Sequence, residues 1–152
     1  MVFSVKCQQY LLNAGWYSSR KIGTLKATLF LLFSGYKIIP YLNSFITEFG
    51  GLEINYKTEN GAEFLFHFDI YKAVRDFDIK WIKEDYLNRV NEKNLCVIGQ
   101  AFSNHVTLML SDSGKMYGGY DENLFLIGIN VHDSIEFLCS GSSSIGLILK
   151  PY

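Results

Sequence analysis

The feature that most constrains the fold is a change in the spacing of apolar residues near residue 50. Before it, apolar residues recur every three or four positions, as on one face of a helix; after it, alternation typical of strands dominates. Three short helices are therefore expected first. They are marked by Phe3, Cys7, Tyr10, Leu11 and Ala14; by Leu25, Leu29, Leu32 and Phe33; and by Leu42, Phe45, Ile46 and Phe49. Ser4 and Pro40 suit helix starts, and Gly15, Ser34-Gly35 and Gly50-Gly51 suit helix ends.

The later part predicts a hairpin, a helical segment, an antiparallel meander and a last helix. Leu52, Ile54 and Tyr56 alternate with polar residues, and Glu59-Asn60-Gly61 predicts a turn into Phe64–Phe68. Ile79, Ile82, Tyr86 and Val90 mark the helical segment, with Asp76 and Asp78 near its start. The meander comprises Leu95–Ile98, Val106–Leu110, Lys115–Tyr120 and Leu124–Ile127, with a turn at Ser111–Gly114. Asn130 and Asp133 resemble a capping box for a helix marked by Val131, Ile135 and Leu138 and ended by Gly141.

This order of elements predicts the α+β class, because strands and helices do not alternate regularly as they do in a parallel doubly wound sheet. The 152 residues are expected to form a single domain, 1–152, built around a mainly antiparallel sheet packed with several helices. Its core is expected at about 3–141, with a C-terminal tail at 142–152. Within the tail, Ser142–Ser144 reads as a polar linker and Ile145–Leu149 as a terminal strand or docked segment.

Aromatic content and charge distribution both point to a binding surface. The chain has 12 Phe, 10 Tyr and 2 Trp, too many for all to be interior, so exposed rings are expected; the alternative is a ring-rich core with Tyr hydroxyls at its rim. The net charge of −1 gives no general attraction to nucleic acid. Residues 1–47 carry five bases and no acid, whereas all 15 acids follow from Glu48 onward. This asymmetry is a pointer to a charged partner.

Cysteine usage and hydropathy predict a cytoplasmic protein. Cys7, Cys96 and Cys139 are odd in number, far apart and without CxxC spacing, so buried reduced thiols are expected rather than disulfides or a zinc site. The apolar run Ala27–Phe33 follows two lysines, as in a signal peptide, but it is short, begins late and has no small-residue cleavage site after it. A bilayer span needs about 20 apolar residues. A membrane segment is not expected.

No motif predicts catalysis, a metal or a cofactor. His67 and Asp69 could offer two ligands, but no second pair has suitable spacing. Cys96 with His105 lacks a feature that would lower the thiol pKa, and Gly141–Gly146 has the wrong spacing for a nucleophile elbow. The rings and bases of Tyr71–Arg89 are interleaved with acids, which argues against nucleic-acid binding. The chain is therefore not expected to be an enzyme.

Several segments, taken in order, resemble the third subfamily of the SUKH superfamily of bacterial immunity proteins. They are LNAGWYSSRKI at Leu12–Ile22, FITEFGGL at Phe45–Leu52, VIGQ at Val97–Gln100, LMLSDSGKMY at Leu108–Tyr117, and Gly128 leading into SIEFLCSG at Ser134–Gly141. Each also has a purely structural interpretation as a helix end, a turn or a core ring. Ser18 replaces a proline common in the family, and Ile22–Phe33 is more apolar than usual there.

The resemblance implies an immunity protein that binds and neutralises a cognate secreted polymorphic toxin, such as a nuclease or nucleic-acid deaminase, by occluding its active site. Acids and rings on such an inhibitor would suit a basic cleft. The candidate contacts are Tyr117, Tyr120, Asp121 and Glu122, with Glu84, Asp85 and Glu92 as a second group. The alternative is a SUKH-type adaptor or regulator that binds a non-toxin partner, and the oligomeric state stays open.

Overall fold

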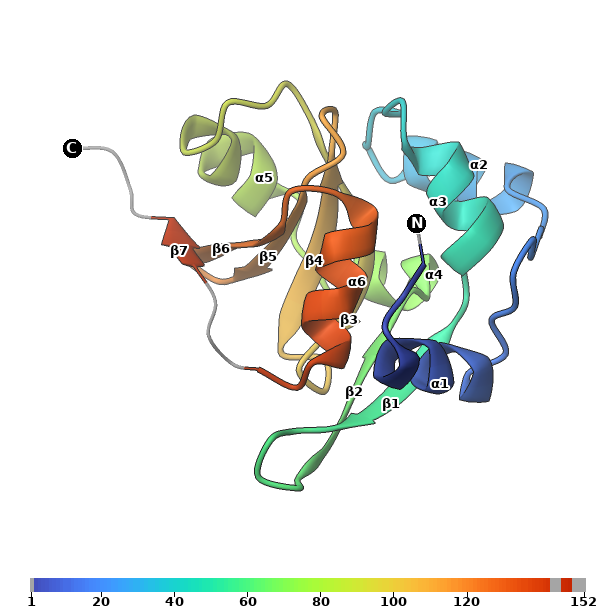
Figure 1. The fold of residues 1–152 in the computed structure, drawn as a ribbon. Helices are drawn as coiled ribbons and strands as arrows, with labels where there is room; N and C mark the ends of the chain where they lie inside the picture. Colours follow the sequence, from blue (N-terminus) through green and yellow to red (C-terminus); the bar gives the residue numbers. More distant parts are fainter. Residues whose placement is uncertain (1, 143–145, 149–152) are drawn as a thin grey trace.

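A continuous antiparallel sheet organises the chain (Figure 1). The computed structural model describes residues 2–142 and 146–148, and within them seven strands lie in the order β1-β2-β3-β4-β5-β6-β7. The strands are β1 Glu53–Lys57, β2 Glu63–His67, β3 Leu95–Ala101, β4 Val106–Ser111, β5 Met116–Tyr120, β6 Asn123–Gly128 and β7 Gly146–Ile148. Each strand pairs antiparallel with the next in sequence, which confirms the predicted α+β class.

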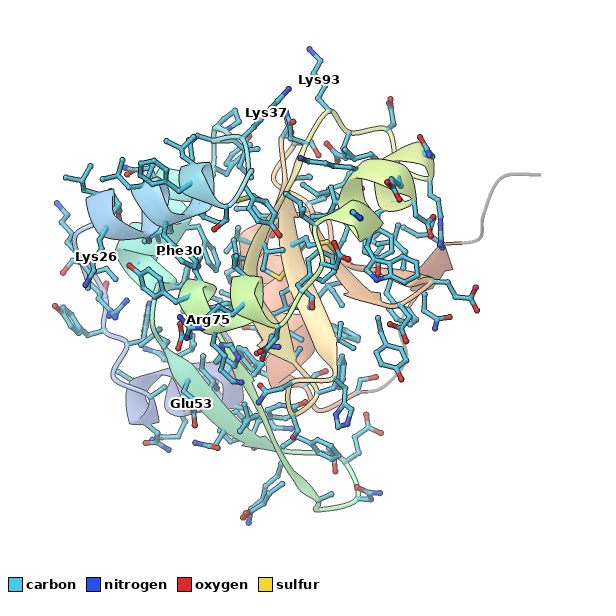
Figure 2. All side chains as sticks on the ribbon, turned by 180° about the vertical axis from the view of Figure 1, so that it is seen from behind. Lys26, Phe30, Lys37, Glu53, Arg75 and Lys93 are labelled. Atoms are coloured by element: carbon cyan, nitrogen blue, oxygen red, sulfur yellow. The ribbon has the colours of Figure 1, made fainter. Side chains whose placement is uncertain are left out.

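Helices cover both faces of the sheet. They are α1 Val5–Asn13, α2 Leu25–Phe33, α3 Leu42–Phe49, α4 Ile70–Arg75, α5 Lys80–Glu84, the 3-10 helix η1 Tyr86–Asn88 and α6 Val131–Cys139. In Figure 1, α6 lies in front of the sheet beside α1, whereas α4 lies behind it. In the opposite view, Figure 2, α4 and α5 lie in front. Every residue of β3 and β4 is consequently buried, since neither face of these strands meets solvent.

Local signals place most helix ends where the sequence predicts them. The Ser4 hydroxyl accepts a hydrogen bond from the Cys7 amide at 3.2 Å, and Asn130 Oδ1 accepts one from the Asp133 amide at 2.7 Å. Gly61, with φ +84°, lies in the turn between β1 and β2, as the Asn-Gly pair predicts. These contacts are short-range in sequence or set by one backbone conformation, so a single sequence shows them.

The buried face of α2 differs from the one its marker residues would suggest. Ala27 and Leu31 face the core, whereas the four markers are exposed: Leu25 (71%), Leu29 (43%), Leu32 (49%) and Phe33 (88%). Because α2 is apolar almost all round, its periodicity cannot select a face; packing against α4 does. Some exposed rings were expected from composition, and Tyr17, Phe33, Tyr41 and Tyr120 are exposed.

The predicted helical segment around Ile79–Val90 is interrupted. The chain leaves helical geometry at Asp85, where φ is −130° and ψ is −66°, so α5 and η1 are separate elements. The helix α4 was not predicted, although the Asp69 carboxylate caps its start by accepting from the Lys72 amide at 3.1 Å.

The C-terminal segment is described only in part. Gly146–Ile148 forms β7 and pairs with β6, as expected of a terminal strand. The rest of the predicted linker and strand, apart from Ser142, lies outside the described residues. Among the helices of the described chain, none is long and apolar enough to cross a membrane.

Candidate partner-binding site

An acidic and aromatic cavity of about 300 Å³ lies between the α4–α5 connection, the β3–β4 loop and the β5–β6 turn. We call it the acidic cavity. Three carboxylates and three rings line it: Asp76, Asp78 and Asp121, and Phe77, Trp81 and Tyr120. Gln100, Asn104, His105, Thr107 and Gly119 complete the lining. No lysine or arginine of the described chain is among the lining residues.

The β5–β6 turn places Tyr120 and Asp121 at the edge of this cavity. Tyr120 pairs with Asn123, so the turn consists of Asp121 and Glu122. Asp121 has φ +48°, a left-handed conformation that Asp and Asn tolerate better than most residues. The buried Tyr86 hydroxyl donates to the Asp121 carbonyl, and Arg89 Nη2 donates to the Glu122 carbonyl. Tyr86 and Arg89 therefore bind the turn through backbone carbonyl groups, and the side chains of both turn residues are exposed at the surface.

Arg89 is the central support of this turn. Its side chain is 2% exposed and binds both carboxylate oxygens of Asp85, each at 2.8 Å. It also donates to the Ile148 carbonyl on β7 at 3.0 Å. Tyr86 lies below the guanidinium, 5.9 Å from ring centre to Cζ, and stacks on Trp81. One arginine thus joins η1, the β5–β6 turn and β7.

A chain of hydrogen bonds runs from the buried His67 through Gln100 to Asp76, and the last two residues line the cavity. His67 Nδ1 accepts from the Asp69 amide at 3.0 Å, so the proton of the neutral ring lies on Nε2, which donates to Gln100 Oε1 at 2.7 Å. Gln100 Nε2 then donates to Asp76 at 3.2 Å. Hydrogen bonds from Lys72 and then Gln100 lower the pKa of Asp76 below its ordinary value of 3.8. His67 and Asp69 are thereby used in the fold, one in this chain and one as a helix cap.

Neither a metal centre nor an activated thiol is present in the described part of the chain. It contains no group of three or more His, Cys, Asp or Glu side chains that could hold a metal ion. Burial raises the pKa of Cys96 to about 12, the opposite of what a nucleophile requires. His105 Nδ1 instead donates to the Phe102 carbonyl at 2.8 Å. As expected, all three cysteines are buried and free; Cys7 and Cys139 lie with their sulfur atoms 2.8 Å apart.

The structure brings only some of the predicted contact residues to this surface. Tyr120, Asp121 and Glu122 are exposed together at the turn, and Glu84 is exposed on α5. The other three are engaged within the fold. Tyr117 is 4% exposed and its hydroxyl donates to Glu92 at 3.3 Å; Glu92 also accepts from Ser113, and Asp85 binds Arg89.

Sequence reasoning did not single out Asp78, Trp81 or Thr107, which the structure places in the lining of the acidic cavity. Asp76 and Asp78 were interpreted only through the helix dipole, yet the pattern Asp76-Phe77-Asp78 followed by Trp81 repeats the alternation of acid and ring seen at Tyr120-Asp121. That shared pattern was the available signal. Thr107 had no such signal, because only strand pairing brings it to the cavity.

Bases from the first third of the sequence and from later segments lie together in the fold. Lys37 lines a second cavity of about 210 Å³ together with Lys83 and Lys93, which come from later segments. Figure 2 shows Lys37 and Lys93 projecting from the same end of the molecule. Tyr36 also lines it, and its hydroxyl is the one buried side-chain polar atom without a hydrogen bond among the described residues.

The resembling segments have the structural roles that their residue types favour. Trp16 is buried and donates to the Glu48 carboxylate at 3.2 Å, while Gly51 and Gly114 have φ of +80° and +86° in turns. No curated protein and no solved structure matches the chain. The family model for the SUKH-3 immunity protein matches residues 3–141, nearly the whole described chain. The chain therefore belongs to the SUKH-3 immunity protein family.

Proposed function

We propose that this immunity protein binds a cognate secreted toxin in the cytosol and neutralises it by covering its active site, without chemical turnover. The toxin is proposed to be a nuclease or a nucleic-acid deaminase. The observation that carries the proposal is the set of exposed carboxylates and exposed or half-buried rings at the acidic cavity and the adjoining β5–β6 turn.

The chemistry of this surface suits a toxin that acts on nucleic acid. Such an enzyme needs lysine and arginine side chains to hold phosphates. Asp78, Asp121 and Glu122 present negative charge to such groups, and Trp81 and Tyr120 add aromatic contact area, which favours a central anchor in a protein interface. Glu84 adds an exposed carboxylate on α5, the helix that also carries Trp81.

The supporting residues below the surface favour a preformed interface. Tyr86 and Arg89 hold the backbone of the β5–β6 turn, and the His67–Gln100 chain holds Asp76. A partner that meets an ordered turn loses less conformational entropy on binding than one that must order it. We therefore assign Tyr117, Asp85 and Glu92 to supporting the surface rather than to contacting the toxin.

The test is co-expression with the toxin encoded beside this protein, scored by cell survival and by co-purification. Tyr120→Ala combined with Asp121→Lys should weaken toxin binding by at least about 100-fold, because the anchor is removed and the sign of the charge is reversed. Glu59→Lys, a charge reversal in the β1–β2 turn, is the matched control and should still protect.

Two results would contradict the proposal. If the double variant protects as well as the native protein, this surface is not the one that binds the toxin. If the native protein neither protects nor co-purifies with the adjacent toxin, the adaptor or regulator alternative takes its place.

A further inference from the structure

We infer that the acidic cavity receives one arginine side chain of the bound protein. This inference rests on the proposed function and names the group that the site recognises. It follows from the charge that the cavity leaves uncompensated, from a hydroxyl that lines the cavity without a hydrogen-bond partner and from the shape of the lining groups.

The first observation is the state of the three carboxylates. Asp76 is already paired, at 3.0 Å from Lys72 Nζ and 3.2 Å from Gln100 Nε2. Asp78 accepts from the Lys80 amide through Oδ1 at 2.9 Å, and its second oxygen accepts no hydrogen bond within the described chain. The Asp121 carboxylate likewise forms none among the described residues. Two carboxylates thus offer open acceptor positions to one cavity.

The second observation is independent of charge and concerns Thr107. The register places Gln100, Thr107 and Gly119 directly opposite one another on β3, β4 and β5, so they share a face of the sheet. All three line the cavity, which directs the Thr107 side chain into it. Thr107 is only 8% exposed, yet its hydroxyl forms no hydrogen bond within the residues that the structure describes. Polar groups on side chains that are so largely buried normally have a partner. The Thr107 hydroxyl keeps access to the cavity and is therefore available to a group of the bound protein.

The lining favours a guanidinium over other cations. Arginine carries five N–H donors in a planar fork, which can be shared between two carboxylates and a hydroxyl, and its flat face stacks on aromatic rings. Trp81, Tyr120 and Phe77 supply such rings here. A bare metal ion would need converging ligands, and the described chain has no group of three. A volume of about 300 Å³ is at the small end of ligand sites, which suits one side chain.

The experiment uses N-acetyl-L-arginine amide as the probe, titrated into the isolated native protein at constant ionic strength and followed by amide and indole NMR shifts. The probe should move the Trp81 indole and the Gly119 and Asp121 amides, with a dissociation constant of about 1 mM, as a ligand of about 15 heavy atoms allows. The Trp16 indole, which is buried against Glu48, should stay fixed as the internal reference.

Two comparison probes separate the kinds of recognition. The citrulline analogue has the same shape without the charge and should produce no shift at these positions. The lysine analogue has the charge without the planar fork and should bind about tenfold more weakly than the arginine analogue. Equal shifts from all three, or shifts that occur elsewhere, would overturn the inference.

Variants then assign the binding to named groups. Asp121→Asn keeps a residue that tolerates the left-handed conformation and should weaken probe binding about tenfold. Thr107→Val keeps the side-chain shape, removes the unused hydroxyl and should weaken probe binding about threefold while leaving the fold intact. Glu59→Gln is the control of equal charge change and should bind the probe as the native protein does. If the probe binds both cavity variants with native affinity, it does not occupy this cavity.

The outcome can be told apart from that of the proposed function. If the Tyr120→Ala, Asp121→Lys variant loses protection but the native protein does not bind the probe, the toxin surface is retained and the arginine site is refuted. Probe binding without any toxin protection would retain the arginine site and refute the immunity surface.

Discussion

Replacing Arg89 by methionine should destabilise this protein more than any other change of a single charged residue at the site. The methionine keeps an unbranched apolar stem but removes a guanidinium that binds Asp85 twice and the carbonyls of Glu122 and Ile148. With its side chain 2% exposed, Arg89 cannot be replaced by solvent at these acceptors without opening the structure.

The size of the expected loss in unfolding free energy follows from the burial of the Arg89–Asp85 ion pair. Removing one partner of a buried ion pair costs about 3–5 kcal/mol. The Asp85 side chain is 18% exposed and recovers part of its hydration, so we expect the lower end, about 3 kcal/mol. For a domain of this size, that loss lowers the melting temperature by roughly 6–12 °C. Arg89→Lys should cost about 1–2 kcal/mol, since one ammonium cannot reach all the acceptors.

Urea unfolding followed by tryptophan fluorescence measures the change. Arg75→Met is the matched control: Arg75 is exposed on α4 (Figure 2), so its replacement should change stability by no more than about 0.5 kcal/mol. A loss below about 1 kcal/mol for Arg89→Met would refute the reasoning, because it would mean that the buried guanidinium is not needed to join these segments.

Three further predictions concern pH, thiols and the surface of α2. Burial raises the pKa of Cys96 from 9.0 to about 12, and burial followed by the nearby Glu92 charge raises that of Tyr117 from 10.0 to about 12. Raised values favour the protonated groups in the fold, so the urea midpoint should fall as the pH rises from about 9 to about 12; a flat profile over that range would contradict this. Because the hydrogen bond from Cys7 and burial raise the pKa of Cys139, the thiols should react with a disulfide reagent only on unfolding, measured by absorbance with and without urea; rapid reaction of the native protein would disprove it. Phe33→Ser on the exposed face of α2 should change unfolding free energy by less than about 0.5 kcal/mol and raise solubility; a larger loss would show that the ring packs in the fold.

Much of the fold is predictable from the sequence because its signals are local. Ser4 and Asn130 each cap a helix by accepting a hydrogen bond from the amide three residues further along the chain. An Asn-Gly pair lies in the β1–β2 turn. Strand segments joined by short turns are expected to pair with their neighbours, and the sheet order follows sequence order throughout. The resemblance to the immunity family also depends on the order of short segments, so the chain alone carries it.

Where local signals are ambiguous, packing decides. The helix α2 is apolar almost all round, and only its contact with α4 determines that Ala27 and Leu31 are buried while Phe33 is exposed. Tyr117 and Tyr120 are equally tyrosines three residues apart on β5, yet one lies in the core and the other at the turn.

The sequence by itself determined the class of fold, the family and the strand segments on either side of the β5–β6 turn. Only the tertiary structure assembled the acidic cavity, because Asp78 and Trp81, Thr107, and Tyr120 and Asp121 come from three separate segments that meet through strand register and helix packing. A side chain acquires its place in the cavity lining from neighbours more than ten residues away, and a single sequence contains no periodicity or motif that records such distances.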